Sequence, residues 1–194
     1  MNNYRKLTAL ASILTAALVP LVMYWLAEAI YPKPCGVETP LLMRVVGIGA
    51  LQILGLYLLL ALRREFTTLL VNKGTRLLLN LWIIMLASLI AAGAVWFVFG
   101  GPSSANIFAS NYITLMVLFM NTVIIIAVTA LAFGIALALN RSLSSRLLRS
   151  FGAGLALAIA LLAVNIFAGS AVLALSLILL AAHFWQPTRH IDIV

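Results

Sequence analysis

Long apolar runs separated by short polar segments dominate the chain. Uncharged stretches of about 20 residues recur along its 194 residues, and at 1.5 Å per residue each is long enough as a helix to cross a hydrocarbon core of roughly 30 Å. The runs lack the alternation of barrel strands, and lipid offers no partner to backbone polar groups outside a helix. The pattern predicts an all-α, polytopic integral membrane helical bundle with short loops, a single transmembrane domain over residues 1–194.

Charge-free windows locate the predicted spans. Four of them are clear, at residues 7–30, 41–62, 77–99 and 111–139. The remaining apolar block, residues 151–185, would be about 52 Å long as one helix, which exceeds the membrane thickness even with tilt. A break at Gly169-Ser170 gives two short spans, 150–168 and 171–185. Six transmembrane helices are therefore predicted, with five as the alternative.

Basic residues gather in segments that fall on one side of the membrane if the spans alternate. Nine of the twelve lie there, which is the positive-inside pattern and predicts a cytoplasmic N-terminus in a bacterial inner membrane. The six-span version also returns the C-terminus to the cytoplasm. Two of the nine are Arg5 and Lys6, near the N-terminus. The other seven are predicted to contact anionic lipids of the inner leaflet or partner subunits: Arg63, Arg64, Lys73, Arg76, Arg141, Arg146 and Arg149.

The net charge of +8 and the isoelectric point of 10.4 follow from this topology, so no nucleic-acid partner is expected. Apolar residues within the basic segments predict short helices lying in the inner interface. One is expected around Phe66, Leu69 and Leu70. A second is expected around Leu143, Leu147 and Leu148.

Ionisable residues within the apolar spans are few, and burying one in a membrane is costly. Glu28 lies near the outer end of the first span and Arg44 near the outer start of the second, so we expect an ion pair near the outer surface, with an ion or proton site as the alternative. His183 is the only histidine inside an apolar block, and Cys35 is the only cysteine. An intrachain disulfide is therefore impossible, and no metal or other cofactor is predicted.

Uncharged polar residues occur near the middle of three spans. They could line a polar path, but the sequence favours hydrogen bonds between helices. This candidate polar layer consists of Gln52, Ser88, Asn121 and Thr122. Glycines such as Gly152 and Gly154 predict close helix contacts.

Motifs for catalysis are missing from the sequence. It has no paired-carboxylate arrangement, no H-E-x-x-H, no G-x-S-x-G and no P-loop. The chain is therefore expected to be non-catalytic, an anchor, assembly or sensing subunit of a membrane complex that forms homo-oligomers or binds other membrane or cytoplasmic subunits. The alternative is a small channel or transporter that uses the candidate polar layer as its lining.

Overall fold

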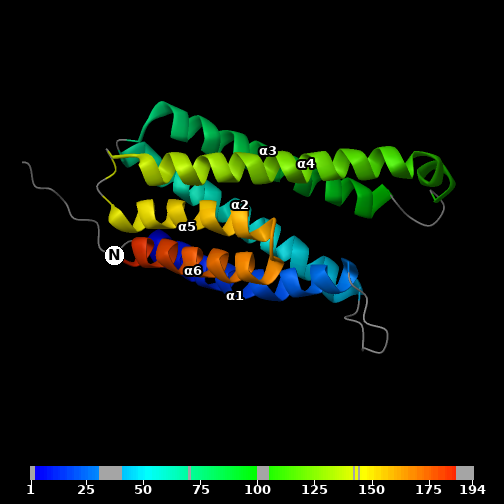
Figure 1. The fold of residues 1–194 in the computed structure, drawn as a ribbon, viewed down its shortest axis with the longest axis horizontal. Coiled ribbons are helices and arrows are strands. Elements are labelled where there is room, and N and C mark those ends of the chain that lie inside the picture. The colour runs from blue at the N-terminus through cyan, green and yellow to red at the C-terminus, as the bar shows by residue number, and fades with distance from the viewer. Residues whose placement is uncertain are drawn as a thin grey trace, which may run out of the picture.

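The computed structural model describes residues 3–30, 41–69, 71–99, 105–141, 143 and 145–186. The regular structure of these residues is all helical, which confirms the predicted fold class. Cys35, Leu70 and the C-terminal tail from residue 187 lie outside the described residues. The described helices are α1 (Asn3–Ile30), α2 (Leu41–Thr68), α3 (Lys73–Phe99), α4 (Ala105–Leu139), α5 (Arg146–Leu162) and α6 (Ile166–Trp185) (Figure 1).

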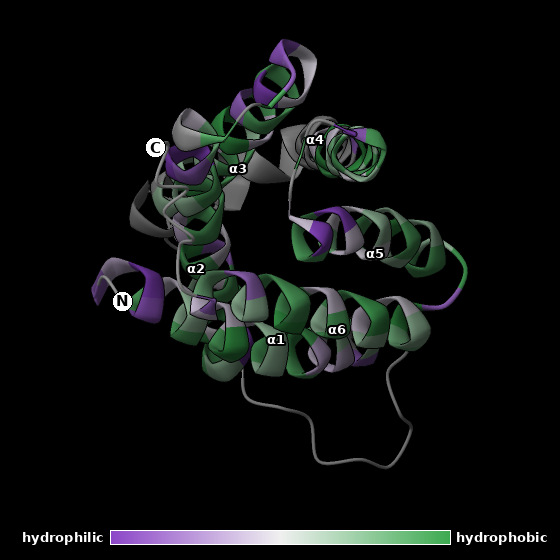
Figure 2. Ribbon diagram, turned by 90° about the vertical axis from the view of Figure 1, so that its left-hand side faces the viewer, coloured by the Kyte–Doolittle hydropathy of each residue, from purple (hydrophilic) through white to green (hydrophobic). Residues whose placement is uncertain are grey.

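The six helices pack in a closed order, each against its two neighbours in the chain, with α6 returning to α1. Figure 1 shows α5, α6 and α1 side by side, with α4 running beside α5 and α3. Most residues along the described helices are hydrophobic, and hydrophilic residues are more frequent toward the helix ends (Figure 2). All the described helices except α5 are long and apolar enough to cross a membrane.

Packing is uneven around this ring. The most extensive contacts join α1 to α6, α6 to α5 and α5 to α4. In the membrane-length window of α1, 44% of the residues are buried within the chain, whereas the corresponding shares are 11% in α3 and 22% in α4. Within residues 73–94 of α3 and 121–139 of α4, most of the surface therefore faces the surroundings of the bundle.

The last apolar block forms a helical hairpin, but its break is not at Gly169-Ser170 as predicted. Helix α5 ends at Leu162 and α6 begins at Ile166, with Asn165 as its N-cap. The Asn165 side chain accepts hydrogen bonds from the backbone N–H groups of Phe167 and Ala168, at 3.0 and 3.1 Å. Asparagine is among the best N-cap residues. Gly169 lies inside α6 instead of breaking it. A Cβ at position 169 would lie 2.5 Å from the Leu162 nitrogen, so glycine allows α6 to approach the end of α5 closely.

The predicted interfacial helix around Phe66 is wrong. Helix α2 continues without a break to Thr68, and Phe66 is buried in the bundle with its ring centroid 6.3 Å from that of Phe133 on α4. Phe133 also meets Trp82 of α3, at 5.6 Å. This aromatic packing accompanies the extension of α2 beyond the charge-free window, since Phe66 is buried in the bundle while Arg63 and Arg64 stay exposed.

The second predicted interfacial segment is also wrong, because α5 begins within it. Leu143 and Leu148 are both almost fully buried in the core. Leu148 lies in the first turn of α5, whose N-cap is Ser145. The side chains of Phe66, Leu143 and Leu148 thus pack into the bundle, and both basic segments overlap the ends of core helices.

Glycines set the spacing of α4 and α5. A Cβ on Gly134 would lie 2.8 Å from the Gly152 carbonyl oxygen, and a Cβ on Gly152 would lie 2.8 Å from the Gly134 carbonyl oxygen. Only residues without a side chain allow these two backbones to approach so closely. The contact predicted at Gly154 is with Ser176 of α6.

Candidate functional site

One arginine joins three helices at the end of the bundle that carries the basic segments, here called the basic end. Arg5 of α1 is only 9% exposed. Its Nη1 donates to Glu65 Oε1 of α2 at 3.1 Å, and its Nη2 and Nε donate to the backbone carbonyls of His183 and Phe184 of α6, at 3.1 and 3.4 Å. Arg5 is thus a buried interhelical link, although its position in the sequence indicated only topology.

Arg5 also satisfies the C-terminal end of α6. Carbonyls in the last turn of a helix lack intrahelical donors and carry the negative end of the helix dipole. The carbonyl of His183 would normally accept from the N–H of residue 187, which is a proline and has no N–H. The guanidinium supplies both the missing donors and a positive charge at this helix end.

His183 extends the link to a fourth helix. Its Nδ1 shares a hydrogen bond of 2.9 Å with the Ser145 hydroxyl, and its Nε2 lies 3.5 Å from Glu65 Oε1 without forming a hydrogen bond of good geometry. The Ser145 oxygen also accepts from the Leu148 N–H and caps α5. Arg5, Glu65, Ser145 and His183 form the Arg5 cluster, which ties α1, α2, α5 and α6 together.

Small polar side chains continue along the same face of α1. The Ser12 hydroxyl donates to the Leu177 carbonyl of α6 at 2.7 Å, and the Thr8 hydroxyl lies 3.3 Å from the Tyr57 hydroxyl of α2. The buried positions of this face follow the 3-4 spacing that marks a helix–helix seam. They are Arg5, Thr8, Ser12, Thr15, Val19 and Val22.

The other end of the α1–α2 pair holds the ion pair expected from the sequence. Arg44 Nη2 lies 3.8 Å from Glu28 Oε2, and both side chains are largely buried. Arg5 and Glu28 are 23 residues apart on α1, and Arg44 and Glu65 are 21 residues apart on α2. At 1.5 Å per residue the two ion pairs are about 32–34 Å apart, close to a hydrocarbon thickness of about 30 Å.

The candidate polar layer does not converge on one interior site. Its four residues lie 15 to 18 residues from the basic ends of their helices, or about 22–27 Å, so their heights are comparable. Ser88 is exposed and donates to the Ile84 carbonyl of its own helix at 2.9 Å, so the expected hydrogen bond to another helix is not formed there. Asn121 is exposed, and Gln52 and Thr122 are half-buried.

Ser88 and Asn121 both interrupt outward-facing apolar stripes. On α3, Ser88 follows Leu81 and Ile84 at helical spacing, and on α4 Asn121 precedes Ile125 and Val128. These two polar groups therefore face whatever surrounds the bundle.

The seven residues predicted to contact lipid or partners lie at the basic end. Six are exposed and Arg149 is half-buried. Arg64 also places its guanidinium 4.4 Å from the centre of the Tyr4 ring on α1, a cation–π contact. Arg5 differs from all of them because it is buried.

The order of Ser145, His183 and Glu65 is that of a hydrolase triad, a hydroxyl, an imidazole and a carboxylate. Here, however, the serine oxygen caps a helix, the carboxylate also pairs with Arg5, and the imidazole is buried. A cavity at the basic end is lined by none of the three. Within the described ranges no three His, Cys, Asp or Glu side chains group as metal ligands. The geometry favours the joining of helices over nucleophilic catalysis.

Sequence reasoning missed the Arg5 cluster, although one signal for it was present. Arg5, Thr8, Ser12 and Thr15 recur at spacings of 3 and 4 within an apolar run, which places four polar groups on one face of the helix. Their partners Glu65 and His183 are 60 and 178 residues from Arg5. Periodicity therefore indicates the face but not what it meets.

Comparison with protein-family models, with curated proteins and with solved structures finds no match.

Proposed function

We propose that this chain is a non-catalytic component of a membrane complex, an anchor, assembly or sensing subunit. The observation that carries the proposal is the use made of buried charge. Arg5 pairs with Glu65 and Arg44 pairs with Glu28, each time between α1 and α2. Buried charges are costly in a membrane and usually mark the working site of a transporter or enzyme. Here they hold helices together.

The side of the bundle formed by α3 and α4 is the proposed contact for partner subunits. It is the least buried part of the ring, and it exposes the Asn121 amide within an apolar stripe. Lipid chains cannot hydrogen-bond an amide, whereas a neighbouring helix can. A partner helix that bears a polar side chain, from a second copy or another protein, fits this surface.

Photo-crosslinking in intact membranes tests this contact. A photoreactive amino acid replaces Ile124 of α4, which is 54% exposed, and a matched control replaces Leu175 of α6, which is 62% exposed. We expect a protein adduct from position 124 and chiefly lipid adducts from position 175, with the adduct at 124 reduced by Asn121→Leu. Lipid adducts alone at both positions would contradict the proposal.

We further propose that the basic end faces the cytoplasm of a bacterium, with α5 and α6 crossing the inner membrane as a hairpin. The exposed arginines support this orientation through the positive-inside rule. The test uses single cysteines in a Cys35→Ser background, at Arg141 in the basic end and at Val164 in the hairpin tip, which is 86% exposed. An impermeant thiol reagent should label Val164→Cys and not Arg141→Cys in intact cells. Protection of both would mean that α5 does not cross.

The alternative function, a small channel or transporter, draws support from the comparable heights of the candidate polar layer. Two of its four residues, Ser88 and Asn121, are exposed on the outside of the bundle, which weakens that support. The double substitution Gln52→Leu and Asn121→Leu separates the two functions. Loss of a measurable flux from a normally assembled variant would favour transport, because a lining must replace the solvation of what passes.

A further inference from the structure

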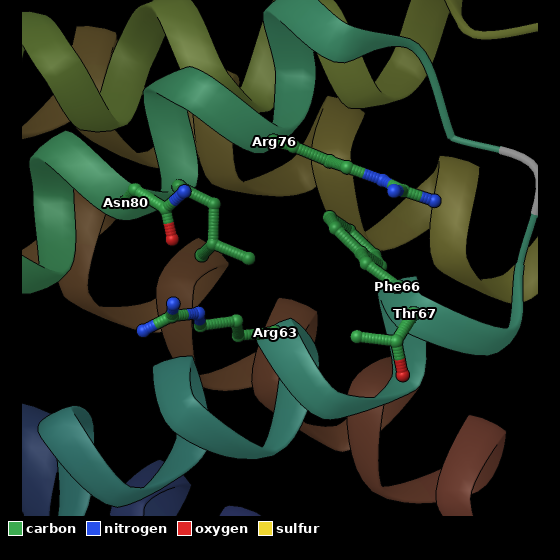
Figure 3. A pocket seen from close by; sticks show the side chains of 6 residues that line it. Arg63, Phe66, Thr67, Arg76 and Asn80 are labelled. Carbon is green, nitrogen blue, oxygen red and sulfur yellow. The ribbon is translucent and has the colours of Figure 1, made fainter.

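A cavity of about 100 Å³ opens between the last turns of α2 and the first turns of α3. The residues that line it have the same spacing on both helices. An arginine is followed three residues later by an apolar residue and four residues later by a polar residue. On α2 these are Arg63, Phe66 and Thr67, and on α3 they are Arg76, Leu79 and Asn80 (Figure 3). Because positions i, i+3 and i+4 share one face, each helix presents a basic, an apolar and a polar group to the cavity.

The lining combines an apolar floor with a cationic rim. Phe66 and Leu79 are almost fully buried, whereas Arg63 and Arg76 are exposed. None of the lining residues is acidic. The nearest acid in sequence, Glu65, is engaged with Arg5. The positive charge at the rim is therefore not neutralised by the residues that form the cavity.

Arg63 and Asn80 have binding capacity that the described residues do not use. No hydrogen bond or ion pair of Arg63 is found in the described part of the chain, whereas Arg76 Nη2 donates to the Leu69 carbonyl at 3.0 Å. The Asn80 Oδ1 atom is buried without a hydrogen-bond partner. A half-turn of this amide exchanges its oxygen for its NH₂ group, which can donate to an anion.

The two side chains lie together in the cavity. Arg63 and Asn80 reach from α2 and α3 toward the same side of it, while Arg76 extends toward the other side, past Phe66 (Figure 3). About 10–15 Å³ is enough to hold one water molecule, so a cavity of this size has room for a tetrahedral phosphate group. Guanidinium groups bind phosphate oxygens through charge-assisted hydrogen bonds.

We propose that this cavity is a binding site for an anionic phospholipid, with the headgroup phosphate held by Arg63 and Asn80 and the start of the acyl region over Phe66 and Leu79, while Arg76 lines the other side of the cavity. The same phosphate chemistry occurs in free phosphate, but the apolar floor favours an amphiphile. The site lies at the end of two apolar helices, where headgroups meet the hydrocarbon core. It goes beyond the proposed subunit role and does not depend on it.

Native mass spectrometry of the detergent-solubilised protein tests the site. The probes are phosphatidylglycerol, phosphatidylcholine and inorganic phosphate, added separately at equal concentration. We expect one retained phosphatidylglycerol and little retained phosphatidylcholine. Arg63→Gln should weaken phosphatidylglycerol binding at least about tenfold, as expected for loss of a hydrogen bond to a charged group. Asn80→Asp should weaken it as much by placing a negative charge beside the phosphate.

The matched control is Arg64→Gln, which removes the same charge from the neighbouring exposed residue outside the cavity. Its lipid binding should stay within about twofold of the wild type, because screened surface charge contributes little. Equal losses in Arg63→Gln and Arg64→Gln would overturn the proposal in favour of general surface attraction. Retention of inorganic phosphate as strong as that of phosphatidylglycerol would overturn the assignment to lipid. Thermal unfolding of each variant without lipid separates misfolding from lost binding, and a folded Asn80→Asp variant with unchanged binding would also refute the site.

Discussion

The two ends of the α1–α2 pair carry the same charges in opposite order. At the basic end α1 supplies arginine and α2 supplies glutamate, and at the far end α1 supplies Glu28 and α2 supplies Arg44. Burial is similar, with side-chain exposures of 11% and 14% at the basic end and 18% and 14% at the far end. The distances differ, 3.1 Å against 3.8 Å.

The larger difference is in the hydrogen bonds that each arginine makes to the described residues. Arg5 also donates to two carbonyls of α6, and its carboxylate partner lies beside His183. At the far end the Arg44 Nε atom is buried without a hydrogen-bond partner. A buried ion pair contributes to stability only when its remaining hydrogen-bonding groups are also satisfied. Among the described residues, similar burial therefore accompanies a network that reaches α6 at the basic end and an ion pair between α1 and α2 at the far end.

Removal of the carboxylate at the basic end should have the largest effect. Glu65→Leu leaves the Arg5 guanidinium buried beside an apolar group, which costs about 3–5 kcal/mol when one partner of a buried pair is lost. The free energy of unfolding, measured by titration with a denaturing detergent, should fall by that order. Glu28→Leu should cost less.

The double variant Arg5→Leu with Glu65→Leu shows how much of that loss is due to an uncompensated charge. It should recover part of the stability lost in Glu65→Leu. Recovery should be incomplete, because the carbonyls of His183 and Phe184 lose their donor. Equal costs for Glu65→Leu and Glu28→Leu would show that the two ends do not differ.

His183→Leu tests whether the imidazole belongs to the network or only fills space. The substitution removes the 2.9 Å hydrogen bond to Ser145 and the approach to Glu65. Loss of a hydrogen bond that leaves a partner buried costs about 1–3 kcal/mol, so the stability loss should be smaller than that of Glu65→Leu. His183→Asn, which can still reach Ser145 from a shorter side chain, should cost less. An Asn variant as unstable as the Leu variant would indicate lost packing alone.

The sequence was sufficient to predict the helical membrane class because that class depends on local properties. An apolar run such as residues 77–99 has one stable form in lipid. The same reasoning placed Glu28 and Arg44 at adjoining ends of consecutive spans, which the structure brings within 3.8 Å. Neighbouring spans in the chain are neighbours in space, so such a pair can be inferred from the order of the spans alone.

The Arg5 cluster could not be inferred in this way because it depends on the contact of α6 with α1. That contact closes the ring between opposite ends of the chain, and no local pattern in α1 indicates which helix will cover it. The break at Asn165 was open to prediction, since N-cap preference is a local property. The prediction instead took Gly169 as the helix breaker, whereas glycine in a membrane helix also serves close packing, as it does here.

Two helix caps allow the comparison to be repeated with a smaller perturbation. Ser145 caps α5 within the Arg5 cluster, and Asn165 caps α6 at the hairpin tip. Each substitution to Ala should cost about 1 kcal/mol through the lost cap. Only Ser145→Ala should be non-additive with His183→Leu, because both remove the same hydrogen bond. Additive effects in both combinations would place Ser145 outside the network.

The smallest effect is expected from coupling of the two side chains at the far end. In a double-mutant cycle, Glu28→Arg and Arg44→Glu should each lower the unfolding free energy by placing like charges 3.8 Å apart, and the double reversal should restore much of that loss. A single pair whose atoms lie as far apart as 3.8 Å should couple by about 0.5–1 kcal/mol, toward the weak end of measured ion pairs. Thermal unfolding of the four proteins in one detergent gives the value. A coupling near zero would mean that proximity at this end contributes no stability, whereas a coupling equal to that of Arg5 with Glu65 would mean that the additional hydrogen bonds to α6 do not strengthen the basic end.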